Sequence, residues 1–154
     1  MVLITRREEF SSSHFCAQPQ LSAAENEALY GKASRPSGHG HNYALEVTVG
    51  GDIDPALGMI MDLKELKEII KRDVIDIYDH RFLNHEVPPF DRVVPTAENL
   101  AADIWRRLAP SIQRGKRHLH GIRLYETPDL FVDYFGEESG ATALGGSPGP
   151  PAVG

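Results

Sequence analysis

Two histidines that stand one residue apart, directly before a β-rich stretch, constrain the fold of this chain more than any other feature. Residues 38–43 read Gly-His-Gly-His-Asn-Tyr, and residues 44–49 continue as Ala-Leu-Glu-Val-Thr-Val. Alternate side chains of a β-strand point to the same face of the sheet. His39 and His41 can therefore present two imidazoles to one point, next to a strand predicted over residues 41–50.

A third histidine, His14, falls within another predicted strand, over residues 2–16. Three neutral imidazoles from two neighbouring strands form a ligand set for a catalytic zinc ion, and they leave a fourth position open to water or substrate. A bare His-x-His pattern also fits a surface turn without metal, because short motifs match by chance. The candidate metal ligands are His14, His39 and His41.

Capping residues and apolar spacing predict the helices. Ser22 opens a capping box for a short helix over residues 22–30, and a loop follows to residue 38. Asp62 begins the first long helix, and Thr96 caps the second. Apolar residues at helical spacing mark the buried faces of the two long helices. These residues are Leu63, Leu66, Ile69, Ile70 and Val74 in the first helix, and Leu100, Ile104 and Leu108 in the second.

The end of the chain predicts two more strands and a tail. Residues 118–127 and 130–135 alternate, and Pro128-Asp129 supplies a tight turn between them. The resulting order, ββααββ, predicts an α+β fold: an antiparallel sheet with two helices packed on one face. Residues 137–154 are rich in glycine, alanine, proline and serine, and we expect them to be disordered outside a domain of residues 1–136.

Composition excludes several functional classes. A chain of 154 residues fits one domain with a single core. Its formal net charge of −6 argues against nucleic-acid binding, and an anionic substrate would need local basic groups to overcome that field. The single cysteine, Cys16, excludes an intrachain disulfide and fits a cytoplasmic protein. No segment approaches the roughly 20 apolar residues that span a membrane.

Six short motifs follow one another along the chain. They lie at residues 10–14 (Phe-Ser-x-Ser-His), 38–43, 58–63 (Gly-Met-Ile-Met-Asp-Leu), 79–84 (Asp-His-x-x-Leu-Asn), 95–99 (Pro-Thr-Ala-Glu-Asn) and 125–127 (Tyr-Glu-Thr). In this order and spacing they resemble the 6-pyruvoyltetrahydropterin synthase family, which includes 6-carboxytetrahydropterin synthase, a relative that acts in 7-deazaguanine (queuosine) synthesis. The resemblance implies the tunnelling fold, a homohexamer of two stacked trimers, and active sites at subunit interfaces.

The resemblance also implies a pterin site. It places Zn²⁺ on the three histidines, with 7,8-dihydroneopterin triphosphate as substrate, and makes Glu126, with Thr127 beside it, the pterin anchor. A pterin edge presents two parallel N–H donors, which one carboxylate accepts as it accepts the fork of an arginine. Glu98, beside Thr96, either helps to bind pterin from a neighbouring subunit or is a first-turn acid favoured by the helix dipole.

Asp79 and His80 match the acid–base pair of the family. An imidazole held by a carboxylate gains basicity and a fixed tautomer, which suits proton transfer near neutral pH. Taken alone, the dipeptide also fits a histidine at a helix end beside a surface aspartate.

The sequence departs from the family at Ala33, where members with this spacing carry the cysteine that abstracts a proton. Three replacements are open: the Cys16 thiol, whose pKa a nearby zinc ion would lower; Ser34 or Ser37 acting through His80; or His80 alone. Cys16 also fits a small buried apolar residue.

Three functions follow as hypotheses. The first is a zinc-dependent lyase of the 6-pyruvoyltetrahydropterin synthase type, and the second is the 6-carboxytetrahydropterin synthase reaction. The third is a metal- and pterin-binding protein without lyase activity, since the family cysteine is absent.

Overall fold

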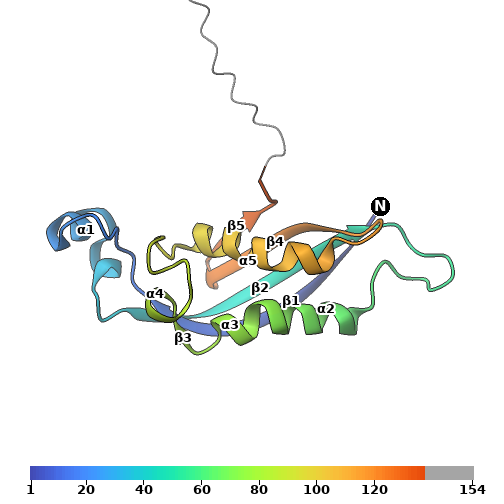
Figure 1. Cartoon of the computed structure of the whole chain (residues 1–154), viewed down its shortest axis with the longest axis horizontal. Helices are drawn as coiled ribbons and strands as arrows, with labels where there is room; N and C mark the ends of the chain where they lie inside the picture. The colour runs from blue at the N-terminus through green and yellow to red at the C-terminus, as the bar shows by residue number, and fades with distance from the viewer. Residues whose placement is uncertain (138–154) are drawn as a thin grey trace, which may run out of the picture.

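The computed structural model, which describes residues 1–137, has a five-stranded sheet at its centre, in the order β3-β1-β2-β4-β5 (Figure 1). The four long strands pair antiparallel with their neighbours, while β3 is a two-residue strand parallel to β1. The strands are β1 (Val2–His14), β2 (His39–Gly51), β3 (Arg81–Phe82), β4 (His118–Thr127) and β5 (Leu130–Tyr134). We expected the tail from residue 137 onward to be disordered; its residues 138–154 lie outside the described part of the chain.

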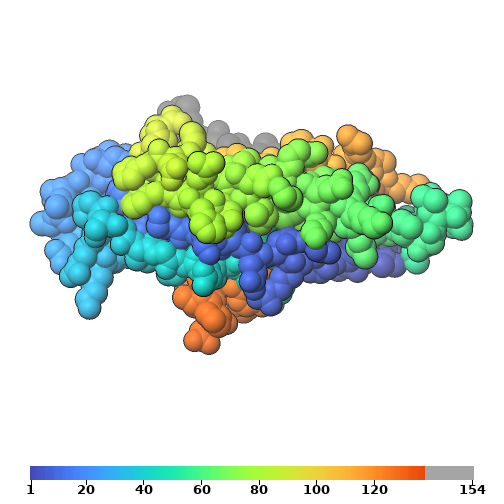
Figure 2. Space-filling model, turned by 90° about the horizontal axis from the view of Figure 1, so that it is seen from below, coloured from blue at the N-terminus to red at the C-terminus, as the bar shows by residue number. Residues whose placement is uncertain are grey.

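Helices α2 and α5 contact each other and pack on the sheet. Figure 2 shows the segment from α2 to α4, in green, lying along β1, in blue. The helical segments are α1 (Ala23–Tyr30), the 3-10 turn η1 (Gly31–Ser34), α2 (Leu63–Ile70), the π turn η2 (Lys71–Ile75), α3 (Asp76–Tyr78), α4 (Leu83–Glu86) and α5 (Ala97–Ile112). The first long helix of the prediction is thus α2, η2 and α3 in succession. No helix within residues 1–137 has the length and apolarity that crossing a membrane requires.

The predicted caps are present. Ser22 and Glu25 form the full capping box of α1, and the Asp62 side chain accepts a hydrogen bond from the Lys64 amide. Thr96 accepts one from the Asn99 amide at the start of α5. Because each cap satisfies amides that a helix leaves without partners, the three helix starts were readable from sequence.

The core lies between the inner face of the sheet and the two long helices. Leu45, Val47 and Val49 of β2 are fully buried there, together with the predicted helical residues Leu66, Ile70, Leu100, Ile104 and Leu108. Leu63 does not join them, since 54% of its surface is exposed. It is the first residue of α2, so no preceding turn of the helix packs beside it.

The α+β class is confirmed, but the exact ββααββ arrangement is not. The four long strands and two long helices follow that order, and the short helix expected over residues 22–30 is present as α1, but β3 and α4 interrupt the order. β3 has two residues and α4 has four, which is too short to show a period in the sequence.

Residues of the motif at 79–84 form hydrogen bonds with the backbone at the outer edge of β1. Asp79 accepts a hydrogen bond from the Ser11 amide at 2.9 Å, and the His80 amide donates to the Ser11 carbonyl at 2.7 Å. The Asn84 side chain accepts from the Phe15 amide and donates to the Phe15 carbonyl, both at 2.9 Å. Because Asn84 occupies both backbone groups of Phe15, β1 ends at His14 rather than at residue 16 as predicted.

We predict that Asn84→Ala lowers the free energy of unfolding by about 2–3 kcal/mol, because the half-buried amide and carbonyl of Phe15 both lose their partner. Asn42→Ala is the control, since the exposed Asn42 side chain bonds only Ser11 among the described residues, and it should cost about 1 kcal/mol or less. Denaturant unfolding of both variants gives the comparison. Equal losses would show that Asn84 does not anchor the end of β1.

Candidate metal centre

Three histidines meet on one face of the sheet because of the register between β1 and β2. His14 lies opposite His39, and His41 follows two residues along β2. Their ligating nitrogens all lie within 4.8 Å of one another, and the Nε2 atoms of His14 and His39 are 3.1 Å apart. Two nitrogens of a tetrahedral zinc site with ordinary Zn–N bonds are separated by roughly 3.3 Å. The spacing therefore fits a single ion.

A backbone carbonyl fixes the orientation of the most buried ligand. Nδ1 of His14 donates to the carbonyl oxygen of Pro95 at 2.7 Å, so the lone pair of Nε2 faces the other histidines. The Asn99 side chain donates to the Val94 carbonyl, and Thr96 caps α5, so both neighbours of Pro95 are held. Such a partner for the second ring nitrogen sets the tautomer of a metal-binding histidine.

Burial keeps two of the imidazoles neutral. The pKa of His14 falls from 6.5 to about 4, chiefly through burial; the Pro95 carbonyl opposes the shift, and His39 and His41 contribute to it. Burial also lowers the pKa of His41, against the opposing carboxylate of Glu126. A metal ion needs the neutral form of imidazole, and both side chains supply it at neutral pH.

Two buried polar atoms lack a hydrogen-bond partner within residues 1–137: Nε2 of His41 and the hydroxyl of Tyr43. Oε1 of Glu126 lies 3.7 Å from the His41 nitrogen, which is too long for a hydrogen bond. Leaving a buried polar atom unpaired costs about 1–3 kcal/mol. The His41 nitrogen thus fits an incoming ion, and the Tyr43 hydroxyl fits a polar group of a bound molecule.

The predicted pterin residues lie at different distances from the three histidines. Glu126, near the end of β4, is beside His41, and Thr127 follows it half-buried. Glu98 is exposed in the first turn of α5, and the Thr96 hydroxyl is engaged in the helix cap. Of these four residues, Glu126 is the one that the structure places against the histidines.

Cys16 lies beside Ala33, the position at which the resemblance led us to expect a cysteine. Its amide donates to the carbonyl of Ala33 at 2.8 Å, so the end of β1 and the loop before β2 touch here. Burial, together with the Glu126 and Glu98 carboxylates, raises the pKa of the Cys16 thiol to about 11. A nearby zinc ion was expected to lower the pKa of this thiol. Burial, Glu126 and Glu98 all act in the opposite direction.

The two serines proposed as relays, Ser34 and Ser37, differ in whether their hydroxyl groups are bound within the loop. Ser34 donates to the Gly31 carbonyl at 2.8 Å and is committed to the loop. Ser37 is exposed.

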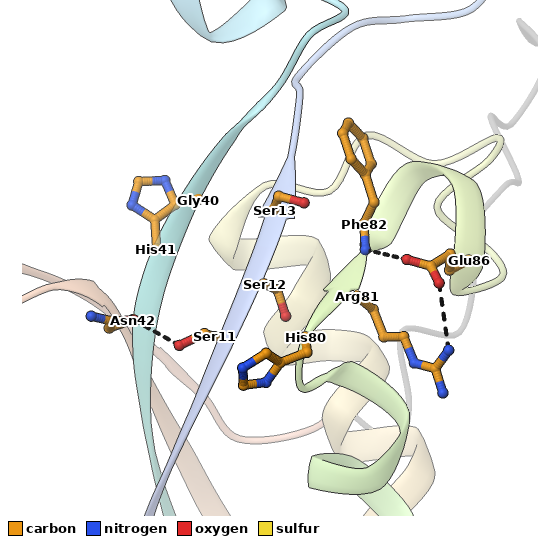
Figure 3. A pocket seen from close by; sticks show the side chains of 10 residues that line it. All are labelled: Ser11, Ser12, Ser13, Gly40, His41, Asn42, His80, Arg81, Phe82 and Glu86. Atoms are coloured by element: carbon orange, nitrogen blue, oxygen red, sulfur yellow. Dashed lines mark hydrogen bonds and ion pairs between the residues drawn. The ribbon is translucent and has the colours of Figure 1, made fainter.

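Asp79 and His80 pair with each other but lie away from the three histidines. Nδ1 of His80 is 2.9 Å from the Asp79 carboxylate, whose pKa is lowered first by the Ser11 amide and then by His80. His80 lines an open cavity of about 510 Å³, whose lining also includes Phe82 and His41, and 84% of its side chain is exposed. Figure 3 shows the His41 ring on the far side of β2 from His80. Within one chain, the expected acid–base pair forms but does not reach the metal site.

Comparisons with known proteins identify the family. A family model described as 6-pyruvoyl tetrahydropterin synthase matches residues 3–137. The chain belongs to this family.

The relatives within the 6-pyruvoyl tetrahydropterin synthase family cover almost all of the described chain. A 6-pyruvoyl tetrahydrobiopterin synthase of Dictyostelium discoideum is 45% identical over 136 residues, which cover 88% of this chain and 97% of the relative. The solved structure of the Caenorhabditis elegans 6-pyruvoyl tetrahydropterin synthase superposes with a TM-score of 0.83 at 35% identity, covering 88% of this chain and 96% of that one. A 6-carboxy-5,6,7,8-tetrahydropterin synthase of Rickettsia felis is 26% identical over 149 residues, 86% of this chain and 99% of the relative. The family resemblance read from the sequence motifs is confirmed.

Sequence reasoning missed the residues that support the histidines. The Pro95 carbonyl and the Tyr43 hydroxyl both lie in motifs that were recognised, at residues 95–99 and 38–43, but received no role. A backbone acceptor leaves no trace in side-chain identity, so only the structure reveals the Pro95 contact. The buried tyrosine was readable, since Tyr43 has the same strand parity as His39 and His41.

We predict that the protein binds about one divalent metal ion per chain, and that His39→Ala and His41→Ala weaken this binding on the order of 100-fold or more. Even partners outside the ligand shell contribute 10–100-fold, so a lost ligand costs at least as much. His120→Ala is the control, because His120 lies on β4 outside the group. Metal analysis after dialysis provides the measurement, and full occupancy in both ligand variants would disprove the site.

Proposed function

We propose that this chain is a zinc-dependent lyase that acts on 7,8-dihydroneopterin triphosphate in the manner of a 6-pyruvoyltetrahydropterin synthase, by triphosphate elimination and side-chain rearrangement. The observation that carries the proposal is the group of three converging imidazoles with the Glu126 carboxylate 3.7 Å from one of them. The greater sequence identity to 6-pyruvoyl than to 6-carboxy synthases supports this reaction over the alternative.

His14, His39 and His41 would hold the zinc ion, and the nitrogen-only ligand set leaves a fourth position for substrate. When bound there, the ion supplies Lewis-acid stabilisation of negative charge that develops on the substrate side chain. The chain contributes the fixed His14 tautomer and the low-dielectric surroundings that make such stabilisation effective.

Glu126 and Tyr43 would orient the pterin ring. The carboxylate accepts the ring N–H and the 2-amino group in a bidentate fork. Burial, followed by the charge of Glu126, raises the pKa of Tyr43 well above its ordinary value, so the hydroxyl remains a donor. Thr127 and Glu98 would lie at the rim, where Glu98 extends from the first turn of α5.

His80 would act as the base, held by Asp79. The elimination removes a proton from a side-chain carbon and releases triphosphate with its bonding electron pair. An imidazole paired with a carboxylate accepts a proton near neutral pH, whereas a thiol whose pKa is about 11 is almost wholly protonated there. This difference supports His80 over Cys16 as the replacement for the family cysteine.

The exposure of His80 supports an assembly of several chains. We propose a homohexamer in which each site is shared between subunits, so that His80 of one chain serves the histidines of another. Exposed apolar residues on and after β5 support an interface at that edge, since unpaired sheet edges invite pairing; they are Leu130, Phe131 and Phe135. The single free thiol supports placement in the cytoplasm.

We predict that zinc-loaded protein converts 7,8-dihydroneopterin triphosphate to 6-pyruvoyltetrahydropterin with release of one triphosphate, and that His39→Ala abolishes this turnover. Product analysis by chromatography and mass spectrometry provides the test. A 6-carboxytetrahydropterin product would establish the alternative reaction instead. Pterin binding without any product would identify a metal- and pterin-binding protein that lacks lyase activity.

We predict that His80→Ala lowers kcat by about 10²–10⁴-fold, the usual contribution of a general base, while Cys16→Ser leaves kcat near the wild-type value. His85→Ala is the matched control, since His85 is an exposed neighbour that stacks on Phe82. Zinc content is measured in each variant. Wild-type turnover in His80→Ala would exclude this base, and a steep loss in zinc-loaded Cys16→Ser would assign the role to the thiol.

A further inference from the structure

A second cavity opens beside the metal ligand His39, on the loop that precedes β2. Its volume is about 380 Å³, within the range of about 300–1,000 Å³ that small-molecule sites occupy. The lining residues are Lys32, Ala33, Arg35, Ser37, Gly38 and His39. In Figure 1 this loop follows α1 at the end of the molecule where β2 begins. The cavity therefore adjoins the candidate metal centre.

Two cations in this lining are free of ion pairs. Within residues 1–137, Arg35 and Arg114 are the two arginines without a carboxylate partner, while the others all have one. Lys32 also forms no ion pair with a described residue. The chain has a net charge of −6, so two unpaired cations around one cavity create a local positive potential on an otherwise acidic protein.

The loop that carries these cations is held in place. The Arg35 amide donates to the Lys32 carbonyl at 3.3 Å, and the Gly38 amide donates to the Arg35 carbonyl at 2.9 Å. The bond from Cys16 to Ala33 ties the loop to the end of β1. Gly38 has a φ of +72°, and a Cβ there would lie 2.8 Å from the Phe82 ring. Lys32 and Arg35 are thus mounted on a fixed backbone, which lowers the entropy cost of binding.

The order of groups along the site matches the order of parts in the substrate. Glu126 lies beside His41, His41 and His39 flank the metal position, and His39 lines the basic cavity. The substrate has a pterin ring, then a three-carbon side chain, then a triphosphate. A ring anchored at Glu126 with its side chain at the histidines extends its triphosphate toward Lys32 and Arg35.

We propose that the basic loop, residues 32–38, is the triphosphate-binding subsite, in which Lys32 and Arg35 bind the phosphate oxygens and the Ser37 hydroxyl donates to them. This inference rests on the proposed function and specifies the part of the same site that takes the charged end of the substrate. Arginine binds phosphate oxygens in a fork, and lysine contributes a point charge.

The test compares ligands with and without the triphosphate. Stopped-flow measurements give the dissociation constants of 7,8-dihydroneopterin triphosphate and 7,8-dihydroneopterin within milliseconds, before turnover at a typical kcat of about 10 s⁻¹. The protein is the zinc-loaded full chain, as wild type, as Lys32→Gln/Arg35→Gln, and as the control Arg114→Gln/Lys116→Gln. The control removes two exposed cations near the start of β4, which pairs there with the far end of β2.

We expect the Lys32→Gln/Arg35→Gln variant to bind the triphosphate ester about 100-fold more weakly, roughly tenfold for each charged hydrogen bond, with dihydroneopterin binding and zinc content unchanged. The control should bind both ligands as the wild type does. The preference for the ester should also shrink as salt rises.

An unchanged preference for the ester in the Lys32→Gln/Arg35→Gln variant would overturn the assignment. So would wild-type binding of GTP as tight as that of the pterin ester, which would indicate a triphosphate site uncoupled from the pterin site. Because binding is read before turnover, a protein that makes no product contradicts the proposed function while the preference for the ester still tests the subsite.

Discussion

The antiparallel register of β1 and β2 is the constraint on which the rest of the site depends. A slip of one residue would turn every side chain of a strand to the other face, and His14 would no longer lie with His39 and His41. Hydrogen bonds from outside the sheet hold this register at the end where the histidines meet. Asn84 binds the backbone of Phe15 directly after His14, and the Pro95 carbonyl binds the His14 ring itself. Residues far along the chain thus fix a geometry that two strands alone would leave free to fray.

The electrostatic layout of the site is asymmetric, and the asymmetry matches the proposed chemistry. One carboxylate, that of Glu126, lies beside His41 and faces the region proposed for a ring that donates hydrogen bonds. Cations lie on the side of His39, where Lys32 and Arg35 surround a cavity assigned to phosphate. A protein with a net charge of −6 repels an anionic substrate at long range, so the local cations must act at short range. The three histidines stand between these two regions.

Much of this arrangement follows from local sequence rules, and the remainder depends on contacts between distant segments. Strand alternation predicted the shared face of the histidines, and capping residues predicted the starts of α1, α2 and α5. The predicted end of β1 was wrong by two residues because Asn84, distant in sequence, hydrogen-bonds the backbone of Phe15. Leu63 was misplaced because periodicity identifies the apolar face of a helix without saying how far along that face burial extends, and Leu63 is the first residue of α2. The position of His80 away from the metal centre depends on how residues 79–84 pair with the edge of β1, which no pattern in that segment reveals.

The central claim is that three imidazoles form a zinc site with one open position. X-ray absorption spectroscopy at the zinc edge tests it most directly on the zinc-loaded protein. The account predicts three nitrogen ligands at about 2.0–2.1 Å, with imidazole scattering and one oxygen ligand from solvent. A sulfur ligand at about 2.3 Å would place Cys16 on the metal, and fewer than three imidazoles would show that the histidines do not converge on one ion. Either result would contradict the site described for this chain.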